Sequence, residues 1–190
     1  MRSPNIHHLI NQKAAVLSEL NRLANTVLTE SDATDAHVST PFLFGIGPKL
    51  KIWWAKRELR SLEFTYALRK KKPDYILFKA HYDRELPSGF KLISRNSVLR
   101  DKLQKINDET ETGIPKIDEN YSLSGNVSIL TRLLLDPSIS DSAWVWNIDN
   151  LSSPNTNDIL GVIGTRGDVQ PQKIEGLFNF VLQIAMKALV

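Results

Sequence analysis

The chain has 190 residues, of which 42% are hydrophobic and 24% charged, proportions that fit one globular domain and exclude a disordered or fibrous chain. It contains no cysteine, which excludes disulfides, thiolate metal sites and cysteine nucleophiles and favours a reducing compartment. The formal net charge is only +3, but this charge is distributed unevenly along the chain.

The first predicted element is a helix over residues 4–29. Ser3 is suited to cap this helix and Pro4 to occupy its first position. Apolar residues then recur at helical spacing from Leu9 to Leu28, which predicts an amphipathic helix. Such a helix packs either on the core of its own domain or against a second chain.

The segment after this helix is polar and has no periodicity. Residues 31–41 therefore predict a flexible connector without regular structure. We accordingly divide the chain into an N-terminal amphipathic helix (1–30), this connector, and an α+β domain (42–190).

A helix followed by a hairpin is predicted in the next part of the chain. Residues 49–59 have apolar side chains at helical spacing. Residues 62–68 alternate strictly between apolar and polar, which predicts a half-buried strand, and residues 75–82 predict a second strand. The lysines between these two strands would form the tip of the hairpin.

The C-terminal part of the chain predicts a second hairpin and a final helix. After short strands and helices between residues 90 and 136, the strands of this hairpin are expected at 144–148 and 159–163. Residues 172–189 are apolar on most sides, so we expect a helix that covers the sheet. The predicted fold class is α+β: a mostly antiparallel sheet of two hairpins plus extra strands, packed by the C-terminal helix, with the N-terminal amphipathic helix.

Charge is concentrated in residues 49–72, here called the basic segment. It contains nine of the chain's 24 basic residues and two of its 21 acidic residues. The rest of the chain therefore has 15 basic and 19 acidic residues. Aromatic residues are interleaved with these charges. A concentrated positive charge of this kind indicates a surface that meets an anionic partner.

Three interpretations of the basic segment compete: a core of aromatics with solvated lysines outside, a nucleic-acid surface, and a membrane-surface segment. Phe64 and Tyr66 share a strand face with Leu62, which is typical of a core and not of an exposed stacking platform. Trp53 and Trp54 cannot both point inward from one helix, so one of them is available to a partner. This favours docking on a membrane surface or a protein over binding RNA.

We therefore expect a non-catalytic interaction or assembly module. Its basic–aromatic face would dock onto an anionic membrane surface or a larger protein complex, with RNA binding as the alternative. Either terminal helix could also support an oligomer. The predicted contact residues are Lys49, Lys51, Trp53, Trp54, Lys56 and Arg57, together with Lys70, Lys71 and Lys72 at the hairpin tip.

One further alternative is an enzyme. His81, Asp83 and Glu85 have strand spacing and would project from one face if the strand continued that far. A turn is expected close behind them, so charged residues at an exposed strand end explain the pattern more simply. We expect neither a cofactor nor a metal ion.

The sequence also bears on location. No stretch approaches the roughly 20 apolar residues of a membrane-spanning helix, and the first residues lack the basic and apolar regions of a secretory signal. We expect a cytoplasmic protein, either soluble or peripheral to a membrane.

Overall fold

The structure is a computed structural model that describes residues 6–40, 47–67, 74–86, 89–97, 108–165 and 171–188. Within these residues the chain forms one eight-stranded antiparallel sheet together with five α-helices. The elements, in chain order, are α1 (Ile6–Glu30), β1 (Asp35–Ser39), β2 (Lys49–Trp53), β3 (Leu59–Ala67), β4 (Tyr75–Tyr82), β5 (Lys91–Ser94), α2 (Pro115–Asn120), β6 (Tyr121–Ser124), α3 (Val127–Leu135), α4 (Pro137–Ser140), the 3₁₀ helix η1 (Val145–Asn147), β7 (Ile148–Asn155), β8 (Asp158–Gly164) and α5 (Pro171–Lys187).

The strand order across the sheet is β1-β2-β3-β4-β8-β7-β5-β6, and every described pairing is antiparallel. The two predicted hairpins are present as β3–β4 and β7–β8. They are joined at the centre of the sheet, where Phe78 of β4 pairs with Gly161 of β8. The predicted α+β class is therefore confirmed.

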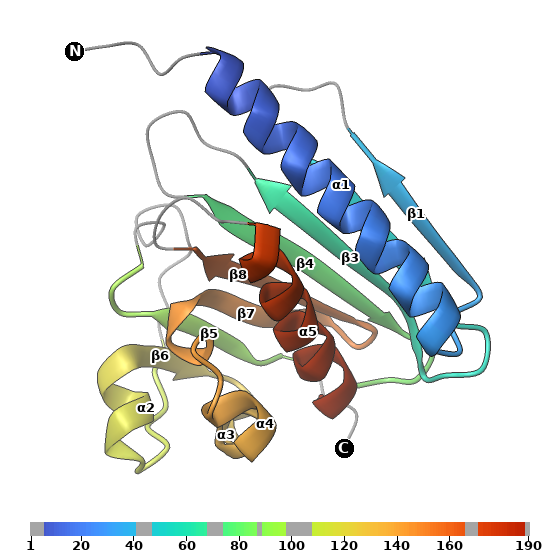
Figure 1. The fold of residues 1–190 in the computed structure, drawn as a ribbon. Helices are drawn as coiled ribbons and strands as arrows, with labels where there is room; N and C mark the ends of the chain where they lie inside the picture. The colour runs from blue at the N-terminus through green and yellow to red at the C-terminus, as the bar shows by residue number, and fades with distance from the viewer. Residues whose placement is uncertain are drawn as a thin grey trace.

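The first and last helices lie side by side on one face of the sheet (Figure 1). Leu20 of α1 is fully buried, and Arg22 makes an ion pair of 2.7 Å with Glu175 of α5. The ring of Phe178 on α5 meets Phe64 of β3 edge to face, with centroids 5.7 Å apart. Of the two locations predicted for the N-terminal helix, the structure shows packing on its own domain.

Side chains of the central strands alternate between this covered face and the opposite one. On β4, Ile76, Phe78, Ala80 and Tyr82 are buried, whereas Leu77, Lys79 and His81 are exposed. Within the described residues, we call the side of β2, β3, β4 and β8 that lies opposite α1 and α5 the open face. An antiparallel sheet with one covered and one solvated face is a common arrangement.

The prediction of a helix over residues 49–59 is wrong. The structure has strand β2 there, followed by a turn. Leu50 and Ile52 are buried, whereas Lys49, Lys51 and Trp53 point to the opposite face. The apolar side chains therefore recur every second residue, as in a strand. Pairing with β1 and β3 on both sides decides this outcome, and the short pattern alone is compatible with either period.

Two other local expectations need correction. Residues 31–41 include strand β1, whose pairing with β2 supplies an order that its own polar sequence does not indicate. Residues 145–147 form the 3₁₀ helix η1 in place of the start of a strand. There Trp146 stacks on Tyr121 with centroids 6.1 Å apart, which ties this turn to β6.

Among the helices that the structure describes, none combines the length and the apolar content needed to cross a bilayer.

Candidate docking surface on the open face

Strand β2 places three of the predicted contact residues on the open face. Lys49, Lys51 and Trp53 alternate with buried residues and so point to the same side. The Lys51 ammonium lies 4.9 Å from the centroid of the Trp53 ring, a cation–π contact that holds the half-buried indole against the sheet.

Trp54 points into the core. It is 2% exposed, and its indole nitrogen finds no hydrogen-bond partner among the residues that the structure describes. The expectation that one of the two tryptophans faces outward is met by Trp53, so Trp54 is unavailable to a partner in this conformation.

Both lysines of β2 share one carboxylate. Lys49 and Lys51 each lie 3.0 Å from an oxygen of Glu63 on β3. Burial opposes ionisation of this carboxyl, but the hydrogen bonds from the two ammonium groups outweigh it and lower the pKa of Glu63. The trio keeps one surplus positive charge.

The turn after β2 holds the next two predicted residues. Lys56 is exposed, whereas Arg57 pairs with Asp32 at 2.5 Å, and this hydrogen bond lowers the pKa of that carboxyl. Arg60 is likewise paired with Asp83. Carboxylates from outside the basic segment therefore neutralise part of its charge.

The remaining predicted contacts, Lys70, Lys71 and Lys72, lie outside the described residues.

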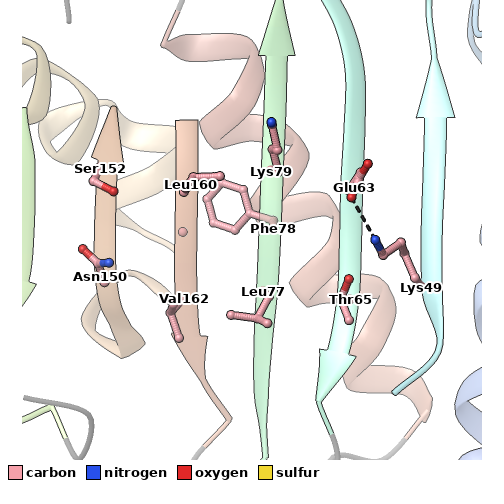
Figure 2. Close-up of a pocket in the computed structure, with 11 residues that line it drawn as sticks. Lys49, Glu63, Thr65, Leu77, Phe78, Lys79, Asn150, Ser152, Leu160 and Val162 are labelled. Carbon is pink, nitrogen blue, oxygen red and sulfur yellow. Dashed lines mark hydrogen bonds and ion pairs between the residues drawn. The ribbon is translucent and has the colours of Figure 1, made fainter. Parts of the chain in front are cut away.

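A shallow hollow of about 380 Å³ lies at the centre of the open face (Figure 2). Sequence reasoning missed this hollow, because it draws on five strands from both halves of the chain. It is lined by Lys49, Glu63, Thr65, Leu77, Phe78, Lys79, Asn150, Ser152, Leu160, Gly161 and Val162.

Strand register explains how the hollow is built. One row across the sheet runs Lys49, Thr65, Leu77, Val162, Asn150, and the next runs Lys51, Glu63, Lys79, Leu160, Ser152. On the two central strands, β4 and β8, three of the side chains in these rows are therefore apolar, namely Leu77, Leu160 and Val162, and the fourth is Lys79. Its two flanks are polar or charged.

Gly161, which pairs with Phe78 across β4 and β8, leaves room for the ring of that residue. A Cβ atom at this position would lie 2.1 Å from Cε1 of Phe78, a distance that no side chain tolerates. The absence of a side chain here leaves space for the aromatic ring.

Asn150 forms one flank of the hollow, and the hydrogen bonding of its side-chain amide is incomplete. Its amide oxygen is buried and has no hydrogen-bond partner within the described part of the chain. Leaving such an acceptor unpaired costs about 1–3 kcal/mol, so a donor that reached it would be favoured.

The proposed catalytic set of the enzyme alternative does not converge. His81 directs Nδ1 to Asp158 at 2.9 Å, whereas Asp83 pairs with Arg60. Glu85 follows the end of β4 and is exposed. In the ranges described above, no three His, Cys, Asp or Glu side chains gather as metal ligands would.

A scan against protein-family models and a search of curated proteins both found no match to the chain.

Proposed function

We propose that the protein is a non-catalytic interaction module that docks onto a protein partner through the open face of its sheet. The observation that carries this proposal is the exposed apolar centre of the hollow. Within the described ranges, the exposed large apolar side chains are Leu28, Leu77, Leu135 and Leu160. Two of these four, each 37% exposed, meet in the hollow, and adjacent exposed apolar groups are typical of interaction sites.

The charges near the hollow favour a protein over a membrane or RNA. Each of the latter partners presents a dense negative surface and requires unpaired cations. Lys49 and Lys51 instead share Glu63. The mixture of paired charges around an apolar centre resembles a protein–protein interface, which has an apolar core and a polar rim.

The position of Trp53 supports the same choice. An indole that anchors a protein in the headgroup region reaches outward from the surface, and a base-stacking platform leaves the ring face free. The Trp53 ring lies under Lys51 and is half-buried. It therefore suits the rim of a protein contact better than either of those roles.

The test begins with a photoreactive benzophenone side chain introduced in place of Leu160, with the same substitution at Leu135 on α3 as the matched control. Both positions are exposed leucines, but only the first lines the hollow. Cross-linking in native extract followed by mass spectrometry identifies the partner, which is then purified. Calorimetry compares its binding to the wild type, Leu160→Asp and Leu135→Asp.

We expect Leu160→Asp to weaken binding at least about 30-fold, as expected for a central interface residue, and Leu135→Asp to leave the affinity unchanged. Equal affinity of the wild type and Leu160→Asp would overturn the proposal. So would retention on vesicles that contain anionic lipid, retention of RNA at about 50 mM salt, or a dimer of this chain in light scattering that Leu160→Asp abolishes. Each of those outcomes assigns the open face to a different occupant.

A further inference from the structure

We infer that two copies of the chain associate through the outer edge of β1, as an antiparallel strand pair with His37 at its twofold axis. This interface lies on one edge of the sheet, apart from the hollow on its open face, and therefore goes beyond the proposed function. Two properties of the edge point to it: the direction of its backbone groups and the side chains that it presents.

The hydrogen bonds of β2 define which backbone groups of β1 point outward. Tyr66 of β3 donates to the carbonyl of Pro48, the residue before β2. Because alternate residues of a strand bond to the same neighbour, the even-numbered residues of β2 bond to β3 and its odd-numbered residues bond to β1. In the register of β1 with β2, the N–H and C=O groups of Ala36 and Val38 then point away from the sheet.

This edge lacks the usual features that prevent strand addition. In the described part of the chain, β1 is the last strand on its side of the sheet, and Figure 1 shows it beyond α1. Its sequence Asp35–Ser39 contains neither proline nor lysine, and its pairing with β2 has no bulge. Natural proteins commonly use those three features to block an exposed edge, so β1 remains able to pair with a further strand.

The outward groups of β1 complement those of a second β1. With His37 opposite His37 of the second copy, Ala36 of each strand faces Val38 of the other, and each such pair exchanges two hydrogen bonds. All the outward backbone groups of both strands are then satisfied. A shift that places Ala36 on the axis sets Val38 opposite Thr34, whose N–H is already bonded to the carbonyl of Trp53 at 2.8 Å.

The side chains favour a second copy over an unrelated extended peptide. Asp35 and His37 are exposed, and neither makes a side-chain hydrogen bond or ion pair within the described ranges. In the proposed register, Asp35 of each copy lies diagonal to His37 of the other, within reach of polar side chains. The carboxylate accepts a hydrogen bond from the imidazole. A copy of β1 therefore supplies both the backbone groups and two matching side-chain pairs.

The twofold symmetry of this dimer places both hollows on one surface. Directly paired residues of antiparallel strands project to the same side of a sheet, so the open faces of the two copies form one continuous face. A partner with two binding segments would gain affinity from simultaneous contact with both hollows. The contact itself is small, since five residues of each copy take part, and we expect a Kd on the order of 0.1 mM.

Disulfide cross-linking tests the register, because the wild-type chain contains no cysteine. His37→Cys places two thiols at the axis, where the Cα atoms of a directly opposed pair are about 4.5 Å apart, within the range of a disulfide. Ser39→Cys is the matched control on the same face of β1, and its two copies would lie roughly 14 Å apart. In a glutathione buffer we expect His37→Cys to form the covalent dimer at least about tenfold faster.

Sedimentation velocity between about 10 µM and 1 mM measures the association without a cross-link. Val38→Pro removes an outward N–H and leaves the bonds to β2 in place, so the Kd should rise about 30-fold with the loss of one donor from each copy. His37→Lys, which brings two ammonium groups together at the axis, should raise it at least about tenfold. His37→Gln should leave it within about threefold, because the amide also donates to Asp35. Thermal melts verify that each variant is folded.

A chain that stays monomeric at about 1 mM overturns the inference. Equal cross-linking rates for the two cysteine variants do the same, as does an unchanged Kd for a folded Val38→Pro or for His37→Lys. Leu160 lies on β8, away from this edge, so Leu160→Asp should leave the dimer intact. A monomeric chain whose partner still loses affinity for Leu160→Asp would remove the dimer and retain the proposed function.

Discussion

The two faces of strands β3 and β4 differ in what completes them. On the covered face, Phe64 is fully buried and meets Phe178 of α5, so the chain itself supplies the complementary surface. On the open face, Leu77 remains 37% exposed beside a charged and polar margin. The same two-residue alternation thus produces a finished core on one side and a partly exposed surface on the other, where we propose that a partner binds.

The largest expected effect compares a residue from each face. Phe64→Ala should lower the free energy of unfolding by about 3–5 kcal/mol, because it removes a buried ring and leaves a cavity. Leu77→Ala should change it by no more than about 0.5 kcal/mol, as is usual for a surface position. Urea denaturation measures both values. A cost above about 2 kcal/mol for Leu77→Ala would show that the open face is packed against something within the folded chain.

The two adjacent tryptophans at the end of β2 provide the same comparison between a buried and a partly exposed side chain. Trp54→Ala should destabilise the fold by about 3 kcal/mol, because the indole is buried among core residues. Trp53→Ala should cost about 1 kcal/mol or less, since this ring is half-buried and contacts Lys51. Thermal denaturation compares the stability of the two variants. A larger loss for Trp53→Ala than for Trp54→Ala would contradict the placement of Trp54 in the core and Trp53 on the open face.

Much of the covered face could be predicted from the sequence. The alternation through Leu62 and Phe64 identified a strand with a buried face, and the apolar periodicity near both ends identified α1 and α5. These features depend on residues that are close in the sequence, so they produce a hydrophobic periodicity that can be recognised in a single sequence.

The open face could be predicted only in part. The lysines of β2 were identified, but their shared partner Glu63 depends on strand register, and Arg57 meets Asp32 from a preceding segment. The hollow depends on the pairing of β4 with β8. Contacts between such distant residues leave no periodic trace in a single sequence, so neither the hollow nor the neutralised charge could be predicted.

The smallest expected effect concerns acid stability on the open face. The lowered pKa of Glu63 means that its pairing stabilises the fold at pH values above the ordinary pKa of 4.5 and that this contribution is lost as the pH falls through the lowered value. We expect a contribution of about 1 kcal/mol or less for such a partly exposed trio.

Unfolding free energies of the wild type and Glu63→Gln between about pH 6 and pH 3 measure this contribution. The difference between them should shrink toward the acidic end. A constant difference across this range would show that the two lysines do not stabilise the ionised carboxylate.

The pairing of β4 with β8 also has a consequence for biosynthesis. Strand β4 leaves the ribosome long before β8, so its unpaired edge and the apolar rows beside it are exposed in the nascent chain. Unpaired edges of this kind promote aggregation between chains. Closure of the sheet across such a long sequence separation also slows folding, so we expect the nascent chain to be prone to aggregation until β8 has been synthesised.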